Sequence, residues 1–295
     1  MTHDAPSPAA SETEDPPPSD GWRQDSDGGL TRLRAALDEI DTALHELLMR
    51  RAEVVEAVGR AGKPNALRPG REASIIRRLL RRHHGALPAA AVYRIWRELL
   101  AGTTAMQARF VVAVCDSDGG SLFTQLAREQ YGVLTPLHAH ASPAAAIGDV
   151  AAGTASIAVL GVPTESDDWW FTLPRPDLHV IARLPFWCAR PAGAATAHAF
   201  VLAPFAPDPS GADRTLLCLE LATETSHARL NDMLAAAGFG SGRVVLHRAG
   251  SSQPARALVD VEGHVAAGDQ RLSLPGILGR PVVLGGYAVP WDGDA

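Results

Sequence analysis

A long apolar stripe dominates the first part of the chain in which hydrophobic residues recur regularly. From position 30 these residues are spaced mostly by three and four, at Leu30, Leu33, Leu37, Ile40, Leu44, Leu47, Val54 and Val58. That spacing places them on one face of an α-helix. No glycine or proline interrupts residues 30–58, so the helix can run for about 30 residues, or roughly 45 Å. A lone helix of that length must pack against another element.

Two more helices are expected after the first. Gly59, Gly62 and Pro64 end the first helix. A second amphipathic pattern covers about residues 71–84, and a third starts at Pro88 and continues to about residue 110. The pattern therefore predicts an all-α region made of three helices.

Beyond residue 110 the hydrophobic period shortens. Apolar runs such as FVVAVC, ASIAVLGVP and HAFVLAP alternate with alanine-rich helical stretches across residues 111–205. This alternation is typical of an α/β lobe. Residues 211–291 then alternate strand, helix, strand and strand. The chain is therefore expected to hold several domains.

Charge and composition divide the chain further. Residues 1–29 hold seven acids and one arginine, and residues 1–28 are rich in proline and serine with almost no aliphatic side chains. Such a tail cannot offset its ordering entropy, so disorder is predicted there. Residues 30–110 hold fifteen bases and eight acids, whereas residues 111–295 hold eleven bases and eighteen acids. Only the helical region is basic.

Several classes of protein are disfavoured. No apolar run approaches the about 20 residues that a membrane span needs, and the N-terminus lacks the order of a signal peptide, so a cytoplasmic protein without a membrane partner is expected. Cys115, Cys188 and Cys218 form no CxxC spacing, so neither a disulfide framework nor a zinc knuckle is indicated.

Basic and histidine-containing stretches give no sign of nucleic-acid or metal binding. The stretch RRLLRRHH has leucines at core spacing and no aromatic platform on which bases could stack. His83 and His84 are adjacent, so on a helix they point about 100° apart and make a poor metal pair. His138 and His140 fall in a strand or loop, and no metal is predicted there.

Three motifs of the helical region agree in order and spacing with one known family. They are LRAALDEIDTALHELLMRRAEVVEAVGRA, RPGREASIIRRL and WRELLAGTTAMQ. Residues 29–110 thus resemble the all-helical chorismate mutases, whose three helices form an intertwined homodimer. The resemblance implies that the substrate is chorismate, a small dianion, which is converted to prephenate in aromatic amino acid biosynthesis.

The implied chemistry accounts for the basic character of this region. The rearrangement is pericyclic, so it needs no nucleophile, general base, metal or cofactor. Catalysis comes from holding the reactive conformer and from stabilising charge on the breaking ether oxygen. Arginine forks suit the two carboxylates because they are bidentate and always charged.

Four residues are assigned by this resemblance to the substrate's carboxylates and hydroxyl. Arg34 and Arg51 take the carboxylates. They lie 17 residues apart, roughly 25 Å along one helix, too far to hold one small ligand together. In the family the intertwined dimer resolves this, because the residue that matches Arg34 reaches into the partner's site. Arg71 and Glu72 match the pair that holds a carboxylate and the substrate hydroxyl.

A lysine and a glutamine face the ether oxygen in the family. Gln107 matches the glutamine, and Thr103 lies one turn earlier on the same face, where the family has a small hydroxyl residue. Gly62 occupies the lysine position, and Lys63, the only lysine in the chain, follows it. We therefore assign the role to Lys63. Arg68 stands where the family often has aspartate, which predicts a weaker hydroxyl contact.

The C-terminal half also resembles known domains. Residues 111–205 are similar to the first lobe of prephenate dehydratases, and residues 211–291 to a ferredoxin-like ACT domain. Only about thirty residues separate PTES from HAF, and His198 and Ala199 replace the Thr and Arg of the dehydratase motif. A vestigial lobe without dehydratase chemistry is therefore predicted, although Glu165 is retained.

Two alternatives stay open from the sequence. One is a working bifunctional chorismate mutase/prephenate dehydratase. The other is a non-catalytic regulatory or effector-binding relative, which is favoured if Gly62 and Arg68 have ended the chemistry.

Overall fold

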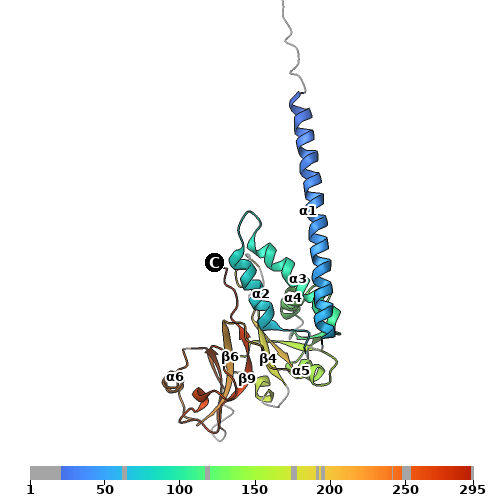
Figure 1. Cartoon of the computed structure of the whole chain (residues 1–295). Coiled ribbons are helices and arrows are strands. Elements are labelled where there is room, and N and C mark those ends of the chain that lie inside the picture. Colours follow the sequence, from blue (N-terminus) through green and yellow to red (C-terminus); the bar gives the residue numbers. More distant parts are fainter. Residues whose placement is uncertain are drawn as a thin grey trace, which may run out of the picture. The chain divides into compact units, whose positions relative to one another are not determined.

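The computed structural model describes residues 21–61, 65–116, 120–173, 178–190, 193, 197–240, 242–247 and 254–293, with side chains from residue 28 onward. The chain divides into two compact units, Met1–Val55 and Glu56–Ala295. Figure 1 colours the chain from its N-terminus to its C-terminus and labels the six α-helices and three of the strands. Lys63, which the sequence assigns to the site, lies outside the described residues.

The first unit contains most of helix α1, Gly21–Arg60. This helix includes the predicted range 30–58 and begins earlier, so residues 21–28, for which composition predicts disorder, are helical. No proline occurs between positions 19 and 63, and extending a helix that has already formed costs little. Residues 1–20, the rest of the predicted tail, lie outside the described residues.

The predicted apolar stripe of α1 is exposed. Its large side chains from Leu30 to Leu47 leave between 46% and 65% of their surface accessible, at Leu30, Leu33, Leu37, Ile40, Leu44 and Leu47. In the described part of the first unit α1 is the only element, so no other described element of that unit covers the stripe. None of the described helices combines the length and the apolarity needed to cross a membrane.

Helices α2, Pro69–Arg82, and α3, Ala89–Gln107, lie close to their predicted ranges. Together with α1 they confirm a helical N-terminal region. Their shared core consists of Ala73, Ile76, Leu80, Tyr93, Leu100 and Phe186. Phe186 follows strand β4 (His179–Leu184), so α2 and α3 share a core with the α/β region.

One nine-stranded sheet organises the second unit, in the order β2-β1-β3-β5-β4-β9-β6-β8-β7. The strands are β1 (Val112–Cys115), β2 (Leu137–His140), β3 (Ile157–Gly161), β4 (His179–Leu184), β5 (Ala199–Ala203), β6 (Asp213–Leu221), β7 (Val244–His247), β8 (Ala255–Glu262) and β9 (Val282–Ala288). β2, β1 and β3 are parallel, whereas β5 is antiparallel to β3 and β4. The other helices among the described residues are α4 (Leu122–Tyr131), α5 (Pro143–Ala151), α6 (His227–Ala236) and two short 3₁₀ turns, Trp169–Thr172 and Gln270–Leu272.

Different helices cover the two faces of the parallel end of this sheet. Val112 and Val114 of β1 belong to a buried cluster that includes residues of α4. Ala113 and Cys115 belong to another cluster, which includes residues of α5. Successive side chains of a strand point to opposite faces, so β1 is buried on both sides. This arrangement confirms the predicted mixed α/β architecture.

The sheet continues without a break into the C-terminal region. Val180 of β4 pairs with Gly285 of β9. Gly285 has a φ of +124°, and a Cβ at this position would lie 2.2 Å from the Val180 carbonyl oxygen. Only glycine allows this approach. A separate ACT domain is therefore not distinguished: the strands predicted for residues 111–205 and 211–291 join in one sheet, because pairing between distant strands leaves no local sequence signal.

Candidate functional site

The N-terminus of α2 carries two predicted site residues, Arg71 and Glu72. The Asp208 carboxylate accepts hydrogen bonds from the N–H groups of Gly70, at 2.9 Å, and of Arg71, at 3.0 Å. Arg68 makes no side-chain cap and pairs with Asp208 at 3.3 Å instead. Asp208 thus satisfies two donors that the first turn leaves open. Asp208 is far from α2 along the chain, so no local sequence signal points to it. The Arg71 residue itself is exposed.

Glu72 points into the protein. Its Oε2 accepts a hydrogen bond from Nη1 of Arg97 at 3.0 Å, and both residues are buried. The Arg97 guanidinium lies over the rings of Tyr93 and Phe186, 5.5 and 5.3 Å from their centroids. Burial raises the pKa of Glu72, and the Arg97 charge opposes that shift. In this chain an arginine of α3 holds the carboxylate that is predicted to bind the substrate hydroxyl.

Thr103 and Gln107 lie in the last two turns of α3. The Thr103 hydroxyl donates to the carbonyl of Leu99 at 2.9 Å, and Nε2 of Gln107 donates to the carbonyl of Thr103 at 3.2 Å. The end of α1 lies beside them, since a Cβ at Gly59 would be 3.5 Å from Cγ of Gln107. The structure thus brings the start of the segment that leads to Lys63 next to the glutamine predicted to share its role.

Glu72 and Gln107 lie at different positions along the axis of α3. Glu72 contacts Arg97, and Gln107 lies ten residues further along the chain, or roughly 15 Å along the helix axis. Within the second unit the structure therefore groups Gln107 with Thr103 and the end of α1, and it places Glu72 in a separate buried pair.

Arg34 and Arg51 lie on α1, in the first unit. Arg34 is exposed and Arg51 is half-buried, and burial lowers the pKa of Arg51. Their separation of 17 residues on one continuous helix corresponds to roughly 25 Å. A single chain therefore does not present both guanidinium groups to one small ligand.

An open cavity of about 520 Å³ lies beside the buried Arg97. Arg94, Arg97, Arg128 and Arg190 line it, together with residues of α4 and of the segment after β4. Arg190 pairs with Glu129 at 2.6 Å. Arg97 pairs with Glu72, and Glu98 also lines the cavity, so Arg94 and Arg128 are the guanidinium groups there that could receive a small anion.

The segment 163–166, the PTES of the sequence, is held by the C-terminal half of the chain. The carbonyl of Pro163 accepts a hydrogen bond from Nη2 of Arg243 at 3.3 Å, and the carbonyl of Glu165 lies 2.9 Å from Nδ1 of His247. Arg243 and His247, at β7, therefore pack against the segment that retains Glu165. Separately, burial lowers the pKa of His198.

Comparison with known proteins identifies the helical region. Residues 33–108 match the family model of chorismate mutase type II. The chain contains a chorismate mutase type II domain. All seven residues that the sequence assigns to the site fall within the matched range: Arg34, Arg51, Lys63, Arg71, Glu72, Thr103 and Gln107.

One curated relative is a bifunctional chorismate mutase/prephenate dehydratase of Neisseria gonorrhoeae (strain ATCC 700825 / FA 1090). It is 34% identical over 95 residues, which cover 32% of this chain and 26% of the relative. This chain therefore spans only about a quarter of the length of that relative.

Solved structures similar to this chain include a protein described as GqqA, a novel type of quorum quenching acylase, at 21% identity and a TM-score of 0.48, over 62% of this chain and 95% of that one. Prephenate dehydratase of Arthrobacter aurescens in complex with L-Phe is 14% identical, with a TM-score of 0.42, over 60% and 89% of the two chains. Prephenate dehydratase of Streptococcus mutans is 14% identical, with a TM-score of 0.43, over 61% and 98%. Likenesses at these scores carry no conclusion about activity.

Proposed function

We propose that this protein is a chorismate mutase, an isomerase that converts chorismate to prephenate by a pericyclic Claisen rearrangement. The match of residues 33–108 to the chorismate mutase type II family carries the proposal. In it Arg34, Arg51 and Arg71 hold the substrate carboxylates, and Gln107 and Lys63 stabilise the ether oxygen as its bond breaks. The closeness of Gly59 to Gln107 supports the last assignment, because Gly59 lies four residues before Lys63 in the chain.

The working form in this proposal is an intertwined homodimer. The exposed stripe of α1 supports it, because no other described element of that unit covers its six large apolar side chains, and a second copy would bury them. The roughly 25 Å between Arg34 and Arg51 supports it independently. In the dimer Arg34 enters the partner's site, so each site takes one of these arginines from each chain.

The C-terminal half is proposed to be a dehydratase-like lobe without dehydratase activity, followed by an ACT-like region. The strand order β9-β6-β8-β7 supports the second part. If β6, β7, β8 and β9 are numbered 1 to 4, their order in the sheet is 4-1-3-2. Along the chain, α6 lies between strands 1 and 2, as the first helix does in a ferredoxin-like β-α-β-β-α-β unit.

The test is to incubate the purified full chain with chorismate and follow the loss of the substrate's ultraviolet absorbance. The product is identified before and after acid treatment, which converts prephenate to phenylpyruvate. We expect prephenate before acid and phenylpyruvate only afterwards. Phenylpyruvate before acid would instead identify a bifunctional mutase and dehydratase.

A matched pair of arginine variants tests whether Arg51 belongs to the active site. Arg51→Ala should lower kcat/KM by at least about a hundredfold, the scale for losing one donor to the transition state. Arg50→Ala serves as the control, because Arg50 precedes Arg51 on α1, is exposed and points about 100° away. Full activity of Arg51→Ala would show that the site is misassigned.

A non-catalytic, effector-binding relative is the second candidate. The Glu72–Arg97 pair favours it, because that carboxylate is already engaged, and the cavity lined by Arg94 and Arg128 gives a small anion a place to bind. This candidate predicts saturable binding of chorismate or another small carboxylate without turnover.

A further inference from the structure

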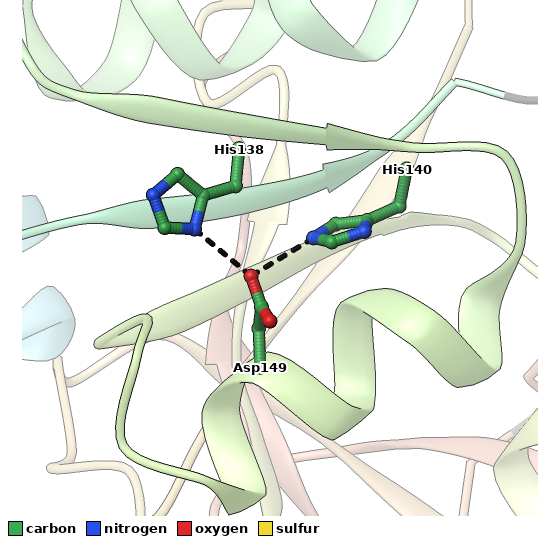
Figure 2. A group of neighbouring side chains, drawn as sticks. All are labelled: His138, His140 and Asp149. Carbon is green, nitrogen blue, oxygen red and sulfur yellow. Dashed lines mark hydrogen bonds and ion pairs between the residues drawn. The ribbon is translucent and has the colours of Figure 1, made fainter.

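Two histidines and an aspartate converge at one edge of the sheet, outside the residues proposed for the mutase reaction. His138 and His140 lie on β2, the outermost strand at that edge, and Asp149 lies on α5. Figure 2 shows both imidazole rings turned toward the same carboxylate. The three residues therefore form a cluster between β2 and α5.

The topology explains why these side chains meet. Residues two apart on a strand share a face of the sheet. The register partners of His138 and His140 on β1 are Ala113 and Cys115, which pack in the cluster containing residues of α5. Both histidines thus face α5, and Asp149 near its C-terminal end faces them.

The distances are those of a chelating set. Nδ1 of His138 and Nε2 of His140 each lie 2.9 Å from Oδ2 of Asp149. All three candidate donor atoms lie within 4.8 Å of one another. Zinc binds imidazole nitrogen and carboxylate oxygen at about 2.0–2.2 Å, which puts neighbouring ligands of a tetrahedral ion about 3.3 Å apart. To hold an ion, each imidazole–carboxylate distance would lengthen by about 0.4 Å, and the two ring nitrogens, which lie no more than 4.8 Å apart, would settle at about 3.3 Å.

Main-chain hydrogen bonds hold the cluster in place. The carbonyl of Asp149 accepts from the N–H groups of Thr154 and Ala155, at 2.9 and 3.1 Å, and from the Thr154 hydroxyl at 3.0 Å. The carbonyl of His140 accepts from the N–H of Asp116 at 3.1 Å. Because the backbone is already fixed, binding an ion costs little conformational entropy for ordering its ligands.

The cluster is open to solvent on one side. The exposed fractions of the side chains are 42% for His138, 21% for His140 and 24% for Asp149. An ion can therefore enter without a rearrangement of the core, and water can complete its coordination.

We propose that His138, His140 and Asp149 bind one divalent transition-metal ion of the zinc class, with water in the remaining positions. Two imidazoles and one carboxylate suit Zn²⁺, Co²⁺, Ni²⁺ or Cu²⁺, whereas Mg²⁺ and Ca²⁺ prefer all-oxygen sites. The pericyclic reaction proposed above needs no metal, so this site is independent of it. A bound ion ties the edge strand β2 to α5.

The test is calorimetric titration of the full chain with ZnCl₂ after treatment with a chelator and its removal. We expect one equivalent bound per chain, and no saturable binding of MgCl₂ or CaCl₂. Saturating Zn²⁺ should also raise the melting temperature, because it binds the folded state. CoCl₂ provides a second probe, since four-coordinate Co²⁺ in a His₂Asp site absorbs visible light much more intensely than the six-coordinate ion does in water.

Three variants decide whether the cluster is the site. His138→Ala, His140→Ala and Asp149→Asn should each weaken Zn²⁺ binding at least about tenfold, which corresponds to about 1.4 kcal/mol. Asp149→Asn keeps the size of the side chain, so it tests the ligand even if an alanine variant folds poorly. A chain with both His83→Ala and His84→Ala is the control and should bind like the parent. No saturable Zn²⁺ binding by the parent chain, or undiminished binding by Asp149→Asn and His140→Ala, would overturn the proposal.

Discussion

The carboxylate of Asp208 accepts a hydrogen bond from the main-chain N–H of Gly70 at 2.9 Å, and so caps helix α2 from the loop that follows β5. The contact is tight, since a Cβ at Gly70 would lie 2.1 Å from the Asp208 carbonyl oxygen. Arg77 of the same helix donates to the carbonyl of Ala212 at 3.0 Å. These contacts join α2 to the loop that precedes β6.

Asp208→Ala should lower the free energy of unfolding by about 1–2 kcal/mol. The substitution leaves two N–H groups of the first turn without their acceptor, and the loss of an N-cap side chain costs about that much. Urea denaturation monitored by circular dichroism measures the change. Asp232→Ala is the control, because Asp232 is exposed on α6 and should change stability by less than about 0.5 kcal/mol. Equal stability of the two variants would show that the cap contributes nothing.

The junction of β4 and β9 gives a second prediction. Gly285→Ala should destabilise the second unit by about 3 kcal/mol, since it combines a positive φ with a Cβ 2.2 Å from the Val180 carbonyl oxygen. Gly268→Ala is matched to it, because a Cβ at Gly268 meets no atom within 4 Å. Thermal melts of the two variants compare them directly. If Gly285→Ala melted together with Gly268→Ala, the close pairing of the two strands would be wrong.

Local patterns predicted the helices well and the sheet only in part. The stripe from Leu30 to Leu47 is a periodic signal within one segment, so α1 is visible in the sequence. The pairing of Val180 with Gly285 joins strands more than one hundred residues apart. The sequence of neither strand indicates which other strand it pairs with. For this reason two separate C-terminal domains were expected where one sheet is found.

The same limit applies to the candidate sites. Matching motifs located Glu72, but they could not show that Arg97 of α3 holds its carboxylate. His138 and His140 are spaced for one face of a strand, yet a metal was not predicted because Asp149 comes beside them only after α5 packs on the sheet. The spacing of residues within one helix or strand indicates which side chains share a face of that element. A site also depends on the side chains that the fold places opposite that face.

The exposed stripe of α1 predicts how assembly responds to charge. A chain with both Leu37→Asp and Leu44→Asp should fall from dimer to monomer, because burying two carboxylates in an apolar interface costs several kcal/mol. Thr42→Asp is the control, since Thr42 is an exposed residue of the same helix that is not part of the stripe. Light scattering coupled to size-exclusion chromatography measures the mass. A parent chain that is already monomeric at micromolar concentration would contradict the dimer.

Mixing two inactive variants tests whether each site takes arginines from both chains. Arg34→Ala and Arg51→Ala should each be nearly inactive alone. When they are unfolded together and refolded at equal concentration, about half of the dimers are mixed. In a mixed dimer one site receives Arg51 from the first variant and Arg34 from the second, and the other site lacks both. The mixture should therefore recover about a quarter of the parent activity, measured as chorismate consumed per chain.

The recovery has its own control. A mixture of Arg51→Ala with a chain carrying both Arg34→Ala and Arg51→Ala holds the same fraction of mixed dimers, but every site in it lacks Arg51, so it should stay inactive. Each variant refolded alone should also stay inactive. If the two single variants failed to restore activity although mixed dimers were detected by a mass tag on one chain, Arg34 would not act across the interface. The roughly 25 Å between Arg34 and Arg51 on α1 would then have to be reconciled with a site built from one arginine only.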